Sequence, residues 1–293
     1  MLGSVLTAIV TPFDENGKID FDVFQRLAQH LVDHGSDGLV VVGTTGESPT
    51  LSDSERNDLI RAALEAVGDR ATVVAATGTY STRHSVCLTK DAHELGADAF
   101  LVVTPYYNKP PQRGIVEHFK AIAAASDRPI VVYNIPSRVV INIESETIEQ
   151  LATIPTVRAV KQAYDDLDEA RRIPEFGLDL YAGDDNLIYP FLELGGVGGV
   201  LVYAHLVGAR VKEMIRLYRE GDKEGARAID EELKPVVDAL GVTINPIPVK
   251  AALNLLGHEV GGLRLPLVEA NEAERAQIRL CLERLGLLSA ATV

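Results

Sequence analysis

Eight short apolar runs, each followed by a longer amphipathic segment, constrain the fold of this chain more than any other feature. They consist largely of Val, Ile, Leu and Ala and occupy residues 5–10, 39–42, 72–76, 99–103, 130–133, 157–160, 178–182 and 199–202. Continuous rather than alternating apolar residues are typical of strands buried on both faces. The segments between them have helical periodicity, as at Phe24, Leu27 and Leu31. Strands that alternate with helices predict a parallel sheet.

Eight such units either close into a barrel or spread into an open, doubly wound sheet. The open form usually carries a glycine fingerprint after its first strand, whereas residues 11–20 read TPFDENGKID. The chain has 293 residues, more than the roughly 250 of one barrel. The extra segments at 226–239, 249–256 and 272–285 have helical patterns. We therefore predict an α/β fold, a (β/α)8 TIM barrel in residues 1–224, followed by a C-terminal helical domain in residues 225–293.

Charge and cysteine content exclude several classes of function. Asp and Glu outnumber Lys and Arg by 42 to 28, so the surface repels nucleic acid and anionic lipid. Cys87 and Cys281 are far apart and outside any C-x-x-C pattern, which argues against a zinc ribbon or a disulfide framework. No long apolar stretch and no basic leader are present, so we expect a cytoplasmic protein with no membrane span.

Reactive and polar residues follow four of the apolar runs. In a barrel, the active site lies at the carboxyl ends of the strands. The residues found there include one lysine, several tyrosines, paired threonines and an arginine, at 43–47, 104–107, 133–138 and 161. We expect these side chains to converge on one rim.

Lys161 is the most informative of them, because it continues a buried run without a turn residue. Burial favours the neutral amine, which is a nucleophile that attacks ketones. The alternative is a structural lysine that reaches the rim or pairs with Asp165. The other rim residues favour the catalytic interpretation.

The neighbours of Lys161 suit imine chemistry. A phenol such as Tyr133 or Tyr107 passes protons when it is hydrogen-bonded to a hydroxyl such as that of Thr45. Backbone amides near Thr44 and Thr45 can hold a carboxylate, and Arg138 can bind a second one through its planar fork. Taken alone, each of these residue types more often has a structural role or lies on the surface than takes part in catalysis or binding.

Three other patterns do not support a competing function. Residues 195–199, GGVGG, lead from a helix into a strand, the reverse of the order in a dinucleotide site. His30 and His34 share a helix face without a third ligand nearby in sequence, so no metal site is predicted. The G-x-S-x-G elbow of a serine hydrolase is missing.

Six motifs together resemble the dihydrodipicolinate synthase family, within the superfamily of N-acetylneuraminate lyase and 2-keto-3-deoxy-acid aldolases. They span nearly the whole chain: GTTGESPTL from residue 43, TPYYNKPPQRG from 104, YNIPSR from 133, YAGDD from 181, NPIPVK from 245 and RLPL from 264. GTTGE and the lysine of the sixth strand mark the superfamily. The arginine of YNIPSR favours the synthase family.

The resemblance implies a Schiff-base lyase of lysine and diaminopimelate biosynthesis that joins pyruvate to aspartate 4-semialdehyde. It implies that Lys161 forms the imine and that Tyr133, Thr44, Thr45 and a neighbouring subunit's Tyr107 relay protons. It also implies that the Thr44 and Thr45 amides bind pyruvate. Arg138 would bind the semialdehyde, and Gly183 and Val200 would line the pocket. No metal or organic cofactor is implied, and a homotetramer built from two dimers is expected.

Two departures from the family pattern leave alternatives open. Leu201 stands where a small hydroxyl residue is expected, and Gln162 follows Lys161 in place of an acidic residue. A different pocket wall would suit another pyruvate-dependent aldolase, or a catalytically silent metabolite-binding relative.

The resemblance also bears on regulation. Lysine-inhibited members bind lysine near positions matching Ser48, Arg56, Tyr80, His84 and Tyr106. An amide and a carboxylate are common in those members at the positions of Tyr80 and His84. The sequence therefore predicts little or no feedback inhibition by L-lysine.

Overall fold

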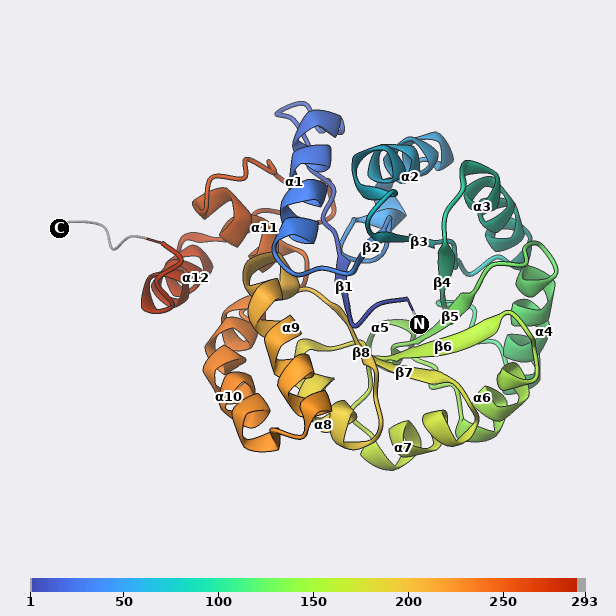
Figure 1. Ribbon diagram of the computed structural model, residues 1–293. Helices are drawn as coiled ribbons and strands as arrows, with labels where there is room; N and C mark the ends of the chain where they lie inside the picture. The colour runs from blue at the N-terminus through green and yellow to red at the C-terminus, as the bar shows by residue number, and fades with distance from the viewer. Residues whose placement is uncertain (1, 289–293) are drawn as a thin grey trace.

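A computed structural model, which describes residues 2–288, confirms the predicted barrel. Eight parallel strands close in sequence order, with β8 pairing back onto β1 (Figure 1). The strands are β1 (Val5–Ala8), β2 (Gly38–Val41), β3 (Thr72–Ala76), β4 (Ala99–Val103), β5 (Ile130–Asn134), β6 (Val157–Gln162), β7 (Asp179–Ala182) and β8 (Gly198–Leu201).

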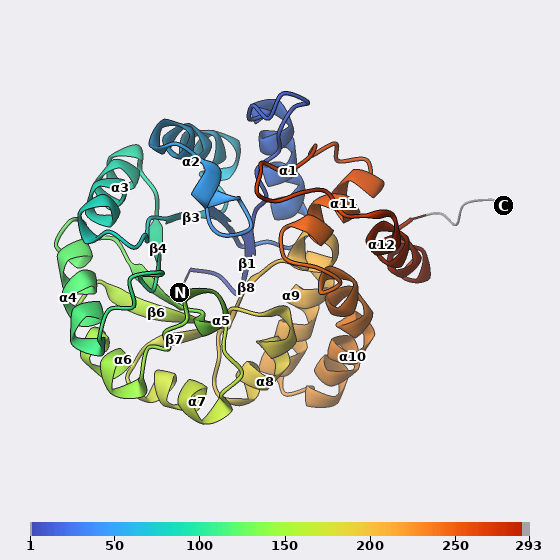
Figure 2. The same cartoon turned by 180° about the vertical axis from the view of Figure 1, so that it is seen from behind.

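A ring of helices surrounds the strands (Figure 1). These helices are α1 (Phe21–Asp33), α2 (Asp53–Val67), α3 (Thr82–Leu95), α4 (Gln112–Ala123), α6 (Ser145–Ala152), α7 (Leu167–Glu175), α8 (Ile188–Glu193) and α9 (Ala204–Glu220). The short helix α5 (Pro136–Val139) lies inside this ring, over the end of the barrel (Figure 2), and single 3-10 turns occur at Ser48–Thr50 and Asp185–Leu187. Their starts follow from local sequence. Ser52 and Glu55, for example, form a reciprocal capping box that satisfies free N–H groups at the start of α2.

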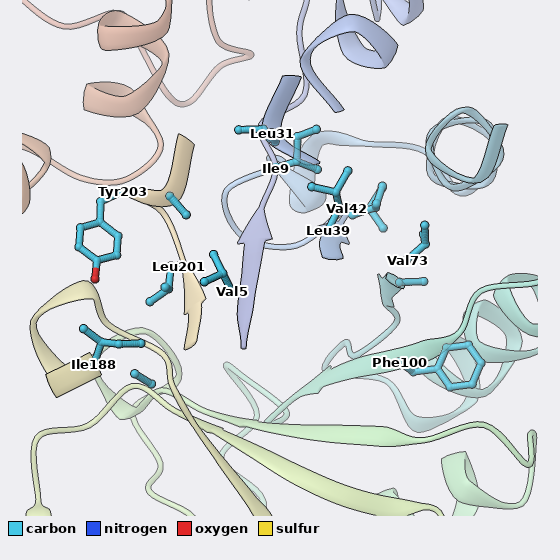
Figure 3. Packing of buried hydrophobic residues seen from close by; sticks show 14 of the residues in the cluster. Val5, Ile9, Leu31, Leu39, Val42, Val73, Phe100, Ile188, Leu201 and Tyr203 are labelled. Atoms are coloured by element: carbon cyan, nitrogen blue, oxygen red, sulfur yellow. The ribbon is translucent and has the colours of Figure 1, made fainter. Parts of the chain in front are cut away.

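The core of the barrel consists of two layers separated by the strands, and a separate small cluster lies among the C-terminal helices. Side chains that point into the barrel, such as Val40 and Val131, form an inner cluster. Those that point outward, such as Leu39 and Val132, pack against the helices in a larger outer cluster. Figure 3 shows part of this outer layer, including Leu31 of α1. Both strand faces are therefore buried, which explains why the runs are continuously apolar.

A β-bulge in β6 sets the direction of the side chains that follow it. Ile130 of β5 aligns with Val157, but the next residue, Val131, aligns with Ala159, so Arg158 has no partner in the register. Arg158 is exposed within an otherwise buried strand. Because side chains alternate along a strand, the extra residue reverses the alternation beyond it. Lys161 consequently points into the barrel rather than toward the helices.

The C-terminal helices α10 (Lys223–Leu240), α11 (Ile247–Leu255) and α12 (Glu272–Arg284) lie together on one flank of the barrel in both views (Figures 1 and 2). The turn between α9 and α10 falls in the region predicted as the junction, and residue 224 is the second residue of α10. The division into domains at residues 224 and 225 stays a proposal. Within residues 2–288, no helix is both long and apolar enough to cross a bilayer.

Candidate active site

A cavity of about 330 Å³ opens at the carboxyl ends of the strands. We call it the barrel-mouth cavity. Six of the predicted site residues line it: Thr44, Thr45, Tyr133, Arg138, Lys161 and Gly183. They come from the ends of four strands, β2, β5, β6 and β7, so only the closed barrel brings them together.

Lys161 lies in the wall of this cavity with 5% of its surface exposed. It aligns with Tyr133 on β5 and with Tyr181 on β7. Its Nζ lies 4.1 Å from the centroid of the Tyr133 ring. Within the described residues it forms no ion pair with Asp165 or any other carboxylate. The structural alternative of a Lys161–Asp165 pair is therefore wrong.

Thr44 and Thr45 lie on the loop after β2, residues 43–47, which we call the threonine loop. The hydroxyl of Thr11 donates to the carbonyl oxygen of Gly46 at 2.7 Å. Glu47 ends the loop in the left-handed region, with φ of 57°. The Oγ1 of Thr45 accepts a 3.0 Å hydrogen bond from Asn245 Nδ2. The loop is thus fixed both from the barrel and from the C-terminal helices.

Arg138 belongs to the short helix α5, directly after β5. Its guanidinium is exposed at the edge of the cavity, and Nη2 donates to the carbonyl oxygen of Asn245 at 3.2 Å. This single neutral acceptor leaves most of the guanidinium's donors for an anionic ligand.

Gly183 follows β7 where two chain segments approach closely. Its N–H donates to the carbonyl oxygen of Gln162 at 2.8 Å. A Cβ at this position would lie 2.8 Å from the Cβ of Ala163. A side chain would therefore displace the neighbouring backbone and the cavity wall.

Tyr107 and Val200 do not line this cavity. Tyr107 is 91% exposed, with φ of 70°. Val200 is buried in the inner cluster of the barrel, and Val202 lines the cavity instead. The roles assigned to Tyr107 and Val200 stay predictions.

The two departures from the family pattern both point away from the cavity. Leu201 is fully buried in the outer layer, where Figure 3 shows it near Ile188. The Oε1 of Gln162 accepts a 3.0 Å hydrogen bond from Asn134. Asn134 also donates to Asn142 at 2.7 Å, in the segment between α5 and α6. Neither residue changes the lining of the barrel-mouth cavity.

Asp185 is a cavity residue that the sequence argument missed. Its carboxylate accepts hydrogen bonds from the N–H groups of Val202 and Tyr203, both at 2.9 Å. Burial raises the pKa of Asp185 to about 7, against the opposing effects of these two amides and of the Lys161 charge. Its place directly after the seventh strand, in YAGDD, is the signal that could have identified it.

The C-terminal helices also contribute to the cavity. Val237 and Leu240 of α10, together with Ile244 and Asn245 beyond it, form part of its wall. The motif NPIPVK marked this segment, but its place in the site depends on contacts between residues about 200 positions apart.

Comparison with known proteins gives a consistent set of relatives. The profile of the Dihydrodipicolinate synthetase family matches residues 1–285. A 4-hydroxy-tetrahydrodipicolinate synthase from Moorella thermoacetica is 50% identical over 290 residues, covering 98% of this chain and 99% of the relative.

Two solved structures are similar along almost their whole length. One is a dihydrodipicolinate synthase from Cyanidioschyzon merolae with lysine bound, at 43% identity and a TM-score of 0.96, covering 98% of this chain and 99% of that one. The other is the chloride-inhibited enzyme from Acinetobacter baumannii complexed with pyruvate, at 35% identity and a TM-score of 0.95, covering 98% and 100%.

Proposed function

The chain belongs to the dihydrodipicolinate synthetase family and is a lyase of the class I aldolase type, and from this premise we propose its substrates and mechanism. It acts as a 4-hydroxy-tetrahydrodipicolinate synthase, joining pyruvate to L-aspartate 4-semialdehyde in lysine and diaminopimelate biosynthesis. The observation that carries the proposal is Lys161, a nearly buried lysine without an ion-pair partner among the described residues, in the wall of the barrel-mouth cavity.

The reaction begins at Lys161 Nζ, which attacks the keto carbon of pyruvate. Water leaves, and an imine forms. Loss of one proton from the pyruvate methyl group gives an enamine, whose carbon attacks the aldehyde of the second substrate. The amino group of that substrate then attacks the imine carbon, and the bond to Lys161 breaks. Because the imine itself accepts electrons, these steps call for no metal or organic cofactor.

Tyr133 and the two threonines handle the protons in this proposal. The Tyr133 ring lies against Lys161 Nζ, which favours proton transfers at the imine nitrogen and at the neighbouring methyl carbon of pyruvate. Thr45 provides a hydroxyl in the same cavity, and Thr44 belongs to the same relay. Such transfers contribute about 10²- to 10⁴-fold to a rate.

The carboxylates of the two substrates bind at separate places. Pyruvate's carboxylate accepts hydrogen bonds from the amides of Thr44 and Thr45, since the glycines on either side let a small ligand approach the backbone. The similar protein from Acinetobacter baumannii was solved with pyruvate. Arg138 binds the carboxylate of the semialdehyde, Gly183 forms part of the surrounding wall, and Val200 supports that wall from the inner cluster.

The assembly we propose is a homotetramer, a dimer of dimers, in the cytoplasm. Tyr107 from one subunit completes the relay of its neighbour, which fits the 91% exposure of this tyrosine in a single chain. We expect mixtures of Tyr107→Phe and Lys161→Ala chains to regain activity, because hybrid dimers contain one intact site. If activity does not return although subunit exchange is demonstrated, Tyr107 acts in the active site of its own chain.

A panel of aldehydes supplied with pyruvate tests the function directly. We expect rapid turnover of aspartate 4-semialdehyde and little reaction with N-acetylmannosamine or sugar aldehydes, judged by product identification. Preference for another aldehyde would make the protein a different pyruvate aldolase. Absence of any condensation, together with retained pyruvate binding, would indicate a silent relative.

A further inference from the structure

The catalytic threonine is in contact with a side chain from the C-terminal part of the chain. Asn245, two residues before α11, donates from Nδ2 to Thr45 Oγ1 at 3.0 Å. A hydroxyl that accepts from an amide keeps its own proton free to donate elsewhere. The backbone carbonyl of Asn245 accepts from Arg138 at 3.2 Å. Asn245 therefore contacts both Thr45, which belongs to the proposed proton relay, and Arg138, which is proposed to bind the second substrate.

The segment that carries Asn245 is anchored to the threonine loop by a buried ion pair. Lys250 of α11 lies 2.9 Å from the Oε1 of Glu47, with side-chain exposures of 1% and 0%. Lys250 also donates to the carbonyl oxygen of Thr11 at 2.8 Å. The second oxygen of Glu47 accepts from the N–H of Arg264 at 3.0 Å. Lys250 also donates to the carbonyl oxygen of Gly262, so both charged groups have their partners in the threonine loop, the segment after β1 and the C-terminal part of the chain.

A buried pair of this kind is poor evidence for added stability, since desolvation offsets most of the attraction. The pair has a larger effect on geometry than on stability. Separating the two groups would leave each as an uncompensated buried charge, so the segments that carry them are held in one relative position. Glu47 also ties the loop internally: its N–H donates to the Thr44 carbonyl oxygen at 3.1 Å. The position of Glu47 therefore determines the path of the backbone that carries Thr44 and Thr45.

We propose that Asn245 and the Lys250–Glu47 pair are positioning residues for catalysis, through which the C-terminal helices hold Thr45 in its proton-relay orientation. The inference rests on the proposed function, because it assigns the relay to Thr45. Asn245 fixes the direction of the Thr45 hydroxyl, and the buried pair fixes the distance between α11 and the threonine loop. The helices after the barrel are thus part of the catalytic apparatus.

The test follows exchange of the pyruvate methyl protons with solvent deuterium, which requires the imine and the relay but no second substrate. We expect Asn245→Ala to lower the maximal exchange rate about tenfold to a hundredfold, the usual effect of a misplaced catalytic group. The pyruvate concentration at half-maximal rate should change less than about threefold, because the loop amides that bind pyruvate remain.

Asn254→Ala is the matched control. Asn254 lies on α11, the helix that follows Asn245, and it donates a hydrogen bond of 2.9 Å to the carbonyl oxygen of Gly261 in the C-terminal part of the chain rather than to the threonine loop. We expect it to lower thermal stability as much as Asn245→Ala does while exchange stays within about twofold of the wild-type rate. Equal losses of exchange in the two variants, or normal exchange in Asn245→Ala, would overturn the proposal.

A combined variant tests the buried pair. Lys250→Met with Glu47→Gln removes both charges, which avoids leaving one unpaired. We expect the exchange rate to fall about tenfold. Adding Asn245→Ala should cause little further loss, because both changes act on the same feature, the position of Thr45. Losses that multiply would show that the pair does not act through Asn245. Wild-type protein that exchanges no pyruvate protons would instead contradict the proposed function itself.

Discussion

The side-chain nitrogen of Lys161 lies over the ring of Tyr133, 4.1 Å from its centroid. The two residues face each other on neighbouring strands, and the bulge at Arg158 gives Lys161 the inward direction that makes this contact possible. An aromatic face can accommodate both the ammonium and the neutral amine. Tyr133 therefore has two distinguishable roles: its ring contacts Lys161, and its hydroxyl takes part in the proposed proton relay.

Tyr133→Phe should separate these roles experimentally. The ring remains against Lys161, so imine formation with pyruvate should be retained. Loss of the hydroxyl should lower turnover by about 10²- to 10³-fold, within the range of general acid–base catalysis. Reductive trapping measures the imine, and product formation measures turnover. Near-normal turnover in this variant would remove Tyr133 from the relay.

Borohydride with pyruvate should label Lys161 irreversibly. Lys250 provides an internal comparison, because it is also buried but is paired with Glu47 and does not line the barrel-mouth cavity. We expect mass spectrometry of peptides to find the pyruvate-derived adduct on Lys161 and not on Lys250. Lys161→Ala should abolish it. Labelling that persists unchanged in this variant would refute the assignment of the nucleophile.

Arg138→Ala should weaken recognition of the semialdehyde selectively. The guanidinium is exposed at the cavity edge of a single chain, so we expect a loss of about tenfold to a hundredfold in its kcat/KM, or roughly 1.4 to 2.8 kcal/mol. Exchange of pyruvate methyl protons should change little, because pyruvate binds at the threonine loop. Unaltered semialdehyde kinetics would remove the basis for assigning the substrate carboxylate to Arg138.

The sequence allowed the barrel and most of the cavity to be predicted, for physical reasons that also explain the omissions. Parallel strands buried on both faces need continuous apolar runs, and strand ends in a closed barrel converge, so Lys161 and Tyr133 could be assigned to one rim. The bulge at Arg158 depends on pairing with β5, which no local pattern encodes. The contact of Asn245 with Thr45 joins distant segments, and it requires the packing of α11 against the barrel.

His205 should make stability depend on pH. It is 3% exposed, its Nε2 accepts from the N–H of Val10, and its Nδ1 donates to the carbonyl oxygen of Val202. The neutral ring fits these partners, and burial lowers the pKa of His205 to about 4. The unfolded chain binds this proton near pH 6.5, so the contribution is complete above about pH 6.5 and declines as the pH falls toward 4.

Denaturant unfolding at about pH 7.5 and about pH 5 measures this effect. Between these values, His205 should contribute about 2 kcal/mol of the loss in unfolding free energy. His205→Gln cannot titrate, so its loss on acidification should be smaller by about that amount. Identical pH dependence in the wild type and the variant would mean that His205 is not the responsible group.

Feedback by lysine is the remaining prediction, and the surroundings of His84 sharpen it. The Nε2 of His84 lies 2.9 Å from Asp53, so the imidazole that replaces the usual carboxylate already has an acidic partner. Glu47 cannot take over, because both of its oxygens are bound by Lys250 and Arg264. Tyr80 is 55% exposed and packs edge-on against Tyr106, with ring centroids 5.3 Å apart.

We therefore expect L-lysine to inhibit weakly or not at all. Losing one partner of a desolvated charge pair costs about 2 to 5 kcal/mol, equivalent to a loss of affinity from roughly 30-fold to several thousand-fold. Steady-state assays across a titration of L-lysine measure the extent of inhibition. Tyr80→Asn with His84→Glu restores the amide and the carboxylate, and should make the enzyme more sensitive to lysine. Strong inhibition of the wild type at physiological lysine would show that Asp53 or another acid supplies the missing carboxylate.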